Sequence, residues 1–110
     1  FAPLLDDSIA VSAPGGLKSH DAPHTPLVLE KNPTPRSKKT GLLAFSAPRE
    51  GFAQTEILSA TSDLREAAAN LYGAMRRLDE AGLELIVAEE IPESGIGAAI
   101  MERLRKAAAR

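Results

Sequence analysis

The chain has 110 residues and a formal net charge of −2, from 13 basic and 15 acidic side chains. This length suits one domain with a buried hydrophobic core. The interspersed charges exclude the long-range basic field that binding to nucleic acid or to an anionic membrane would need, and no apolar run reaches the ~18 residues of a transmembrane helix. Because cysteine is absent, disulfides and thiolate metal sites are excluded, and we expect a cytoplasmic protein.

Residues 1–25 form a proline-rich region with two adjacent glycines. Proline removes backbone donors and glycine raises the entropy cost of ordering, so we predict an extended arm with little regular structure. Its apolar residues are numerous for a free linker, and we expect them to dock on this domain or on a neighbour: Phe1, Leu4, Leu5, Ile9 and Val11. Because the chain starts with Phe1 rather than Met, we expect that a longer segment precedes it.

Residues 26–110 carry the predicted domain. Strands are predicted at residues 26–30, 41–46, 55–59 and 85–88, and helices at residues 63–81 and from residue 94 or 95 onward. The strands at 41–46 and 85–88 are continuous apolar runs, which is typical of strands buried on both faces of a parallel sheet. The alternation predicts a three-layer α/β domain with a short, mostly parallel sheet of about four strands and flanking helices, in which residues 55–88 cross over right-handedly.

The helix at 63–81 has the clearest signals. Asp63 can cap it, Glu66 completes an acidic capping box, and Gly82 supplies the left-handed residue that ends it. Its predicted core stripe is Leu64, Ala67, Ala68, Leu71, Met75 and Leu78, with Tyr72 at the edge and its hydroxyl at the rim. The stripe predicted for the last helix is Ile96, Ala99, Ile100, the Arg103 stem, Leu104 and Ala107.

The segment 31–40 is predicted to be a loop because it has two prolines and no hydrophobic periodicity. Ten residues with two prolines cannot supply a crossover helix, so the strand order stays open. Its four bases could contact phosphate, but no aromatic residue interleaves to stack bases, and the pattern is more typical of a solvated loop. These bases are Lys31, Arg36, Lys38 and Lys39.

Residues with chemical potential are few. His20 and His24 could share a metal on one helical face, but Pro23 and Pro26 disfavour a helix there, so a solvent-facing pair is the simpler interpretation. The turn Gly95-Ile96-Gly97 could present N–H groups to an anion, or it could be a tight turn chosen for close packing.

Glu89, Glu90 and Glu93 crowd the end of a strand, where carboxylates can bind a metal or act as an acid/base pair. Nothing supplies a nucleophile to complete such a site, and a polar rim is the simpler interpretation. The residues themselves therefore predict no catalytic, cofactor-binding or metal-ligating residue in this chain.

Two stretches resemble one family. Residues 13–26, APGGLKSHDAPHTP, resemble the linker signature of the longer threonylcarbamoyl-AMP synthases, a Ser-Pro-Gly-Met run leading to His-Tyr-x-Pro. Residues 63–108 resemble the family's C-terminal domain in order and spacing. The shared pieces are Asp63-Leu64, Asn70-Leu71-Tyr72, Leu78-Asp79, Gly95-Ile96-Gly97, Ala99-Ile100, Arg103-Leu104 and Ala107-Ala108.

This resemblance implies a Rossmann-like C-terminal domain without catalytic residues of its own. The whole enzyme joins threonine, bicarbonate and ATP, with Mg, into threonylcarbamoyl-AMP for the t6A modification of tRNA. The chemistry belongs to a YrdC-like N-terminal domain, the implied partner in cis or in trans. The linker lies across the catalytic cleft as a lid, and its candidate residues here are Pro14, Gly15, Ser19, His20 and Pro23. Asp21 stands where the family usually has tyrosine, and a carboxylate cannot pack as an aromatic ring does.

Three functions stay open. The first is a non-catalytic accessory or lid domain of such a synthase. The second is a stand-alone nucleotide- or anion-binding module that uses Gly95 and Gly97. The third is a structural remnant whose arm mediates self-association.

Overall fold

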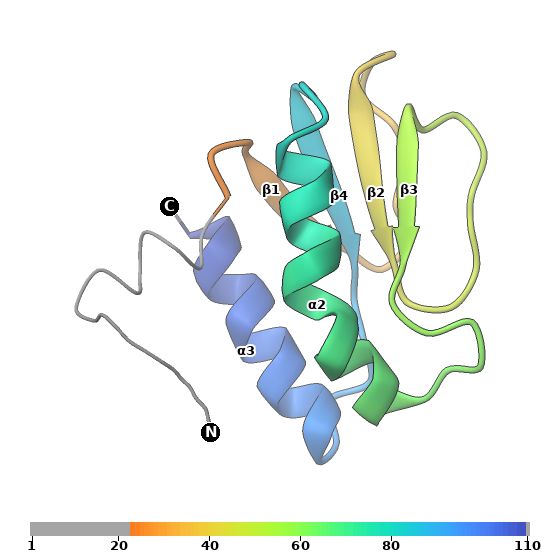
Figure 1. The fold of residues 1–110 in the computed structure, drawn as a ribbon, viewed down its shortest axis with the longest axis vertical. Helices are drawn as coiled ribbons and strands as arrows, with labels where there is room; N and C mark the ends of the chain where they lie inside the picture. Colours follow the sequence, from red (N-terminus) through yellow and green to blue (C-terminus); the bar gives the residue numbers. More distant parts are fainter. Residues whose placement is uncertain (1–22, 110) are drawn as a thin grey trace.

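The computed structural model describes residues 23–109. Its elements are β1 (Leu27–Glu30), β2 (Thr40–Ala44), β3 (Gln54–Ile57), α2 (Leu64–Asp79), β4 (Leu85–Glu89) and α3 (Ile96–Ala108). The four strands form one parallel sheet in the order β1-β4-β2-β3, which settles the strand order and confirms the predicted α/β fold. Figure 1 shows α2 and α3 side by side on one face of this sheet, and the β3–α2–β4 unit crosses over right-handedly as predicted. No helix within residues 23–109 is long and apolar enough to cross a membrane.

The strand β2 lies in the middle of the sheet and is buried along its whole length. It pairs with β4 on one side, where Leu42 is opposite Val87, and with β3 on the other, where Leu42 is opposite Thr55. Side chains alternate between the two faces of a strand. The prediction that this apolar run is covered on both faces is therefore confirmed.

The helix α2 begins as its sequence predicts. The Asp63 carboxylate accepts hydrogen bonds from the N–H groups of Arg65 and Glu66, at 2.9 and 3.2 Å. Glu66 does not close the capping box directly. Its carboxylate accepts from the buried Ser59 hydroxyl at 2.5 Å, and Ser59 Oγ in turn accepts from the Asp63 N–H at 2.8 Å. Of the predicted core stripe, Ala67, Leu71, Met75 and Leu78 are buried, together with Ala74, while Leu64 and Ala68 are partly buried and pack against the core.

The buried face of α3 agrees in part with the predicted one. Ile100, Leu104 and Ala107 are buried as predicted, and Gly97 and Met101 complete the face that packs on the domain. Ile96 is 38% exposed, and Ala99 and Arg103 are exposed as well, so these three predictions were wrong. The physical reason is a close approach of backbones: a Cβ at Gly97 would overlap the carbonyl oxygen of Pro92. A glycine without side chain thus marks the buried face, which an apolarity count cannot detect.

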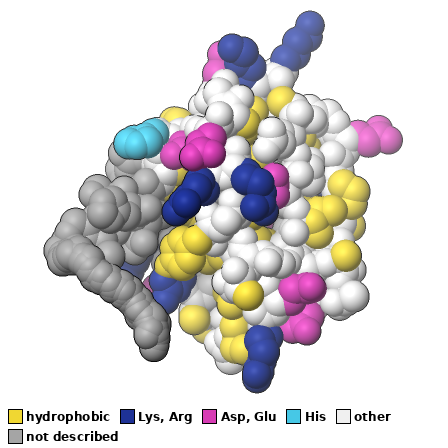
Figure 2. Space-filling view, viewed as in Figure 1, with side chains coloured by type: hydrophobic (Ala, Val, Ile, Leu, Met, Phe, Trp, Pro, Cys, Tyr) yellow, Lys and Arg dark blue, Asp and Glu magenta, His cyan; other side chains and the backbone are white. Residues whose placement is uncertain are grey.

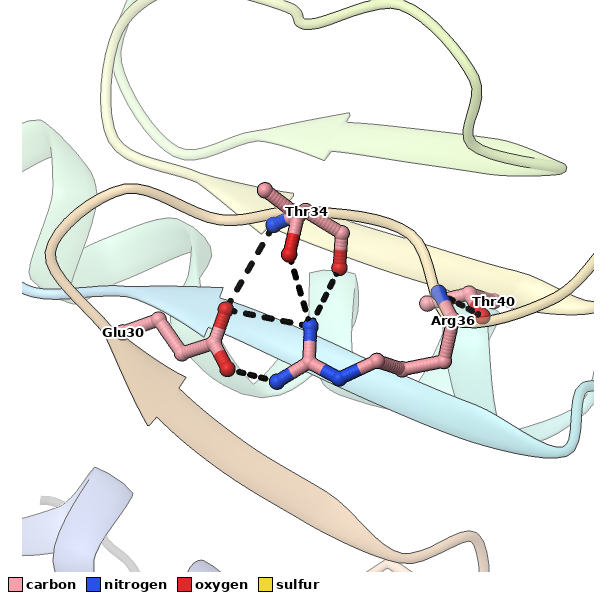
Figure 3. A network of polar contacts seen from close by, with 4 residues as sticks. All are labelled: Glu30, Thr34, Arg36 and Thr40. Carbon is pink, nitrogen blue, oxygen red and sulfur yellow. Dashed lines mark hydrogen bonds and ion pairs between the residues drawn. The ribbon is translucent and has the colours of Figure 1, made fainter.

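The connection from β1 to β2 crosses β4 without a helix, and polar contacts hold it (Figure 3). The Glu30 carboxylate pairs with the Arg36 guanidinium and accepts from the Thr34 N–H at 3.4 Å. Arg36 also donates to the Thr34 carbonyl at 2.6 Å. The buried Thr40 hydroxyl accepts from the N–H groups of Arg36 and Ser37 at 3.0 and 2.9 Å. Arg36 is therefore engaged within the loop.

The sheet face opposite the helices has its own apolar residues. Leu42, Ala44 and Val87 are fully buried, and they alternate with the strand residues that pack beneath the helices. The connections 31–39 and 45–53 meet where a Cβ at Gly51 would lie 3.0 Å from Pro35 Cγ. Within the described residues, irregular connections rather than helices therefore form the third layer.

Candidate functional site

The carboxyl ends of the parallel strands are the first place to look for a site. In open α/β sheets, ligands bind at the carboxyl ends of the strands, at the point where the strand order reverses. The neighbours β4 and β2 lie at such a point, because β4 is followed in the sheet by β1 on one side while the chain after β2 leads to β3 on the other. The ends of these two strands carry Glu89 and Phe45.

A carboxylate of the protein itself occupies this position. Glu89 Oε1 accepts a hydrogen bond from the Phe45 N–H at 2.9 Å. Its other oxygen, Oε2, lies 3.3 Å from the Arg49 guanidinium. A backbone N–H and an arginine are the groups that would hold a phosphate. An incoming anion would therefore have to displace the side chain of Glu89.

The glycine turn before α3 is explained by packing. Gly95 has a positive φ of 56°, and Gly97 fits against the Pro92 carbonyl as described above. The N–H groups of Gly97 and Ala98 donate to the carbonyls of Ser94 and Gly95, at 3.0 and 3.1 Å. An anion site at Gly95 and Gly97 stays a prediction. The N–H groups of Gly97 and Ala98 already have partners within the turn.

The other carboxylates at this edge are dispersed. Glu93 pairs with Arg105 and raises the pKa of that guanidinium, and Glu90 is exposed. Residues 23–109 contain no group of three or more His, Asp or Glu side chains arranged to hold a metal ion. The geometry of this edge is that of a polar rim.

A different polar cluster lies at the C-terminal end of α2, where the arm joins the domain. Both carboxylate oxygens of Asp79 accept hydrogen bonds: Oδ2 from the His24 N–H at 3.1 Å, and Oδ1 from the Thr25 N–H at 2.9 Å and the Thr25 hydroxyl at 2.8 Å. Thr25 is 8% exposed. We call Asp79, His24 and Thr25 the arm clasp.

Electrostatics favour the ionised form of Asp79. Burial raises the pKa of its carboxyl. The hydrogen bonds from Thr25 and His24 and the charge of His24 lower this pKa, and together they outweigh burial. The resulting pKa lies below the ordinary value of 3.8. Sequence reasoning missed this cluster, because it joins residues 54 and 55 positions apart. Two signals pointed to Asp79: an aspartate at the end of a helix, where a negative charge is unfavourable, and the place of Leu78-Asp79 among the pieces that resemble the family.

Most of the predicted lid residues lie outside the described part of the chain. These are Pro14, Gly15, Ser19 and His20. Asp21 also lies outside the described residues. The fifth candidate, Pro23, is described and buried, directly before the arm clasp. His24 is exposed, and its partner in the suggested metal pair, His20, is outside the described residues.

The outer surface of the two helices carries one aromatic side chain. Tyr72 is 39% exposed. The Arg103 guanidinium lies 5.4 Å from the centre of its ring and donates to its hydroxyl. The hydroxyl thus reaches the rim as predicted, although the ring is less buried than expected. Figure 2 shows basic and acidic side chains interspersed over this face, without a patch of one sign.

Comparison with known proteins gives a consistent result. The family model described as "Threonylcarbamoyl-AMP synthase, C-terminal domain" matches residues 3–109. The threonylcarbamoyl-AMP synthase of Pyrococcus abyssi is 29% identical over 86% of this chain and 31% of its own length. The synthase of Bacillus subtilis is 30% identical over 96% of this chain and 34% of its own length. The chain therefore spans about a third of these relatives.

Solved structures agree with the sequences. The crystal structure of P. abyssi Sua5 complexed with L-threonine superposes with a TM-score of 0.66 at 27% identity, over 80% of this chain and 29% of that one. A doubly substituted P. abyssi Sua5 superposes with a TM-score of 0.58 at 35% identity, over 66% of this chain and 20% of that one. In both cases the likeness covers a minor part of a much longer protein.

Proposed function

Because the chain belongs to the family of threonylcarbamoyl-AMP synthase C-terminal domains, we propose that it is the non-catalytic accessory domain of such a synthase. In this role it supports the formation of threonylcarbamoyl-AMP from ATP, threonine and bicarbonate, for t6A modification of tRNA in the cytoplasm. The observation that carries the proposal is the family match over residues 3–109 in a chain that spans about a third of its relatives. ATP and Mg would bind to the YrdC-like catalytic domain, in cis or in trans.

The arm is the part that we assign to work with the catalytic domain. Residues 1–25 would cover the catalytic cleft as a lid, with Pro14, Gly15, Ser19, His20 and Pro23 as its candidate residues. A lid excludes water and holds the reactants together during the reaction. Asp21 replaces the tyrosine of the family pattern, and Asp21→Tyr is therefore expected to strengthen the closure of such a lid.

The proposal is tested with the complete 110-residue chain. We expect the chain alone to form no threonylcarbamoyl-AMP from the three substrates. Fused behind the N-terminal two-thirds of the B. subtilis relative, in place of that protein's own matching segment, it should raise product formation above that of the N-terminal part alone. Normal turnover by the isolated chain, or a fusion no more active than the N-terminal part, would contradict the proposal.

A calorimetric titration of the chain with ATP, AMP and pyrophosphate separates the accessory role from a stand-alone nucleotide-binding module. The accessory role predicts millimolar or weaker binding, because the Glu89 carboxylate already holds the Phe45 N–H and Arg49. Micromolar binding would favour the module instead. The substitution Glu89→Gln keeps the hydrogen bond to Phe45 and removes the negative charge beside Arg49. Titration of this variant is the matched control, because it shows whether that charge is what excludes the anions.

A further inference from the structure

The Asp79 carboxylate is used for the arm rather than for its own helix. Within residues 23–109, the three hydrogen bonds that it accepts come from His24 and Thr25. The last turn of α2 is closed without it, because the N–H of the C-cap residue Glu80 donates to backbone carbonyls within the helix. The position is also unfavourable for a carboxylate, since the C-terminal end of a helix carries partial negative charge. The contacts with the arm offset this penalty.

A second attachment follows at the next residue, Pro26. The Pro26 carbonyl accepts a hydrogen bond from the Ile86 N–H at 2.8 Å, which extends the pairing of β1 with β4 by one step. The chain entering the domain is thus held by α2 at residues 24 and 25 and by β4 at residue 26. Pro23 is buried at the start of this short stretch. Figure 1 shows where the described chain enters, at the end of the domain that also carries the C-terminal end of α2.

We propose that Asp79 is a positioning residue for the linker: by holding His24 and Thr25 against the end of α2, it fixes the place at which the linker joins this domain. This inference rests on the proposed accessory function. Asp79 acts through the arm and touches no substrate. A junction held at residues 24 and 25 leaves the linker fewer orientations relative to this domain than a junction that is free up to β1, and so lowers the entropy cost of ordering the two parts.

The clasp itself is tested first, by amide hydrogen exchange on the 110-residue chain. In Asp79→Ala, the Thr25 amide should exchange at least about tenfold faster, because its acceptor is lost. Exchange in the buried part of α2, at Leu71 and Ala74, should stay unchanged. Glu80→Ala is the matched control, since it removes a charge from the same helix end and leaves the clasp intact. Unchanged exchange at Thr25 in Asp79→Ala would overturn the proposal.

The positioning role is tested in the fusion described above. Asp79→Ala should lower kcat for product formation about fivefold or more, with the KM for ATP within about twofold, because the catalytic domain is untouched. Thr25→Val, which removes only the hydroxyl bond, should have a smaller effect of the same kind. Thr25→Val also tests the positioning role if Asp79→Ala fails to fold.

The outcomes are distinguishable. If the unsubstituted fusion is no more active than the N-terminal part alone, the accessory function fails, while the exchange data still decide the clasp. If that fusion is active, Thr25 exchanges fast in Asp79→Ala and kcat equals that of the unsubstituted fusion, the clasp exists but the positioning role is refuted. A kcat loss that Glu80→Ala shows equally would also refute it, because the cause would then be the helix end and not the arm.

Discussion

Two aspartates stand at the ends of α2 and use the same functional group in opposite ways. At the N-terminal end, Asp63 accepts from N–H groups two and three residues away, where a carboxylate also matches the positive end of the helix dipole. At the C-terminal end, Asp79 accepts from N–H groups 54 and 55 residues away, against the dipole. The first contact serves the helix, and the second fixes a distant segment to it.

The side chains around the two ends of α2 show the same difference between contacts within the domain and contacts with the arm. The N-terminal end is tied to the segment that precedes it: the buried Ser59 hydroxyl links Asp63 and Glu66, and Asn70 donates to the Leu58 carbonyl at 2.8 Å. The C-terminal end receives the chain that enters from the arm. Changes at the N-terminal end should therefore cost stability, while changes at the C-terminal end should mainly release the arm.

Gly97→Ala should have the largest effect, and it tests how closely the turn before α3 packs against the N-terminal end of α2. The new Cβ would overlap the Pro92 carbonyl oxygen and approach the Leu64 side chain at the start of α2 to 3.5 Å. Because backbone has to move, we expect a loss of about 3 kcal/mol or more in the free energy of unfolding, measured by urea denaturation. Gly73→Ala is the control: its Cβ would meet only the flexible end of Arg77, so the helix should gain up to about 1 kcal/mol. A tolerated Gly97→Ala would contradict this account.

Ser59→Ala should have the next largest effect. The substitution leaves the Asp63 N–H and the Glu66 carboxylate without the hydroxyl that joins them. Loss of a buried, well-connected hydroxyl costs about 1–3 kcal/mol, and thermal unfolding should show it as a lower Tm. Thr61→Ala is the control, since Thr61 is exposed and lies 3.3 Å from the Ser59 hydroxyl at the edge of this network. Equal effects of both substitutions would show that the network has no special role.

The sequence predicted the Asp63 cap and the left-handed Gly82 at the two ends of α2, but it did not predict the partners of Glu66 and Asp79. Asp63 acts on its neighbours in the chain, and periodic apolar residues reveal a helix face without tertiary information. The Asp79 contact depends on how β1 is placed beside β4, and no local pattern encodes that pairing. The buried face of α3 was predicted only in part for a similar reason, because Gly97 is buried by the approach of Pro92 and not by its own apolarity.

Asparagine substitutions at the two ends should separate the roles with smaller changes. Asn is as good an N-cap as Asp, so Asp63→Asn should change the free energy of unfolding by less than about 0.5 kcal/mol. Asp79→Asn keeps only one acceptor oxygen for three donors and should cost about 1 kcal/mol, together with faster exchange at Thr25. A parallel series of urea denaturations decides the point, and the order of the two losses is the critical result. A larger loss for Asp63→Asn would reverse the comparison on which the arm clasp rests.

Acid should weaken the arm clasp, and of the changes considered it should have the smallest effect on the free energy of unfolding of the domain. The pKa of Asp79 is lowered below 3.8 in the folded state, because hydrogen bonds from Thr25 and His24 and the charge of His24 outweigh the effect of burial. A lowered carboxyl pKa contributes stability that is present above the unfolded-state pKa and is lost as the pH falls through the folded-state pKa. The difference in unfolding free energy between the parent chain and Asp79→Asn should therefore be constant from about pH 7 to pH 5 and shrink below about pH 4. Urea denaturation of both chains across this range measures it. A difference that shrinks already between pH 7 and pH 5 would assign the pH dependence to a group other than Asp79. A difference that persists to pH 2 would mean that the lost oxygen acceptor matters and the charge does not.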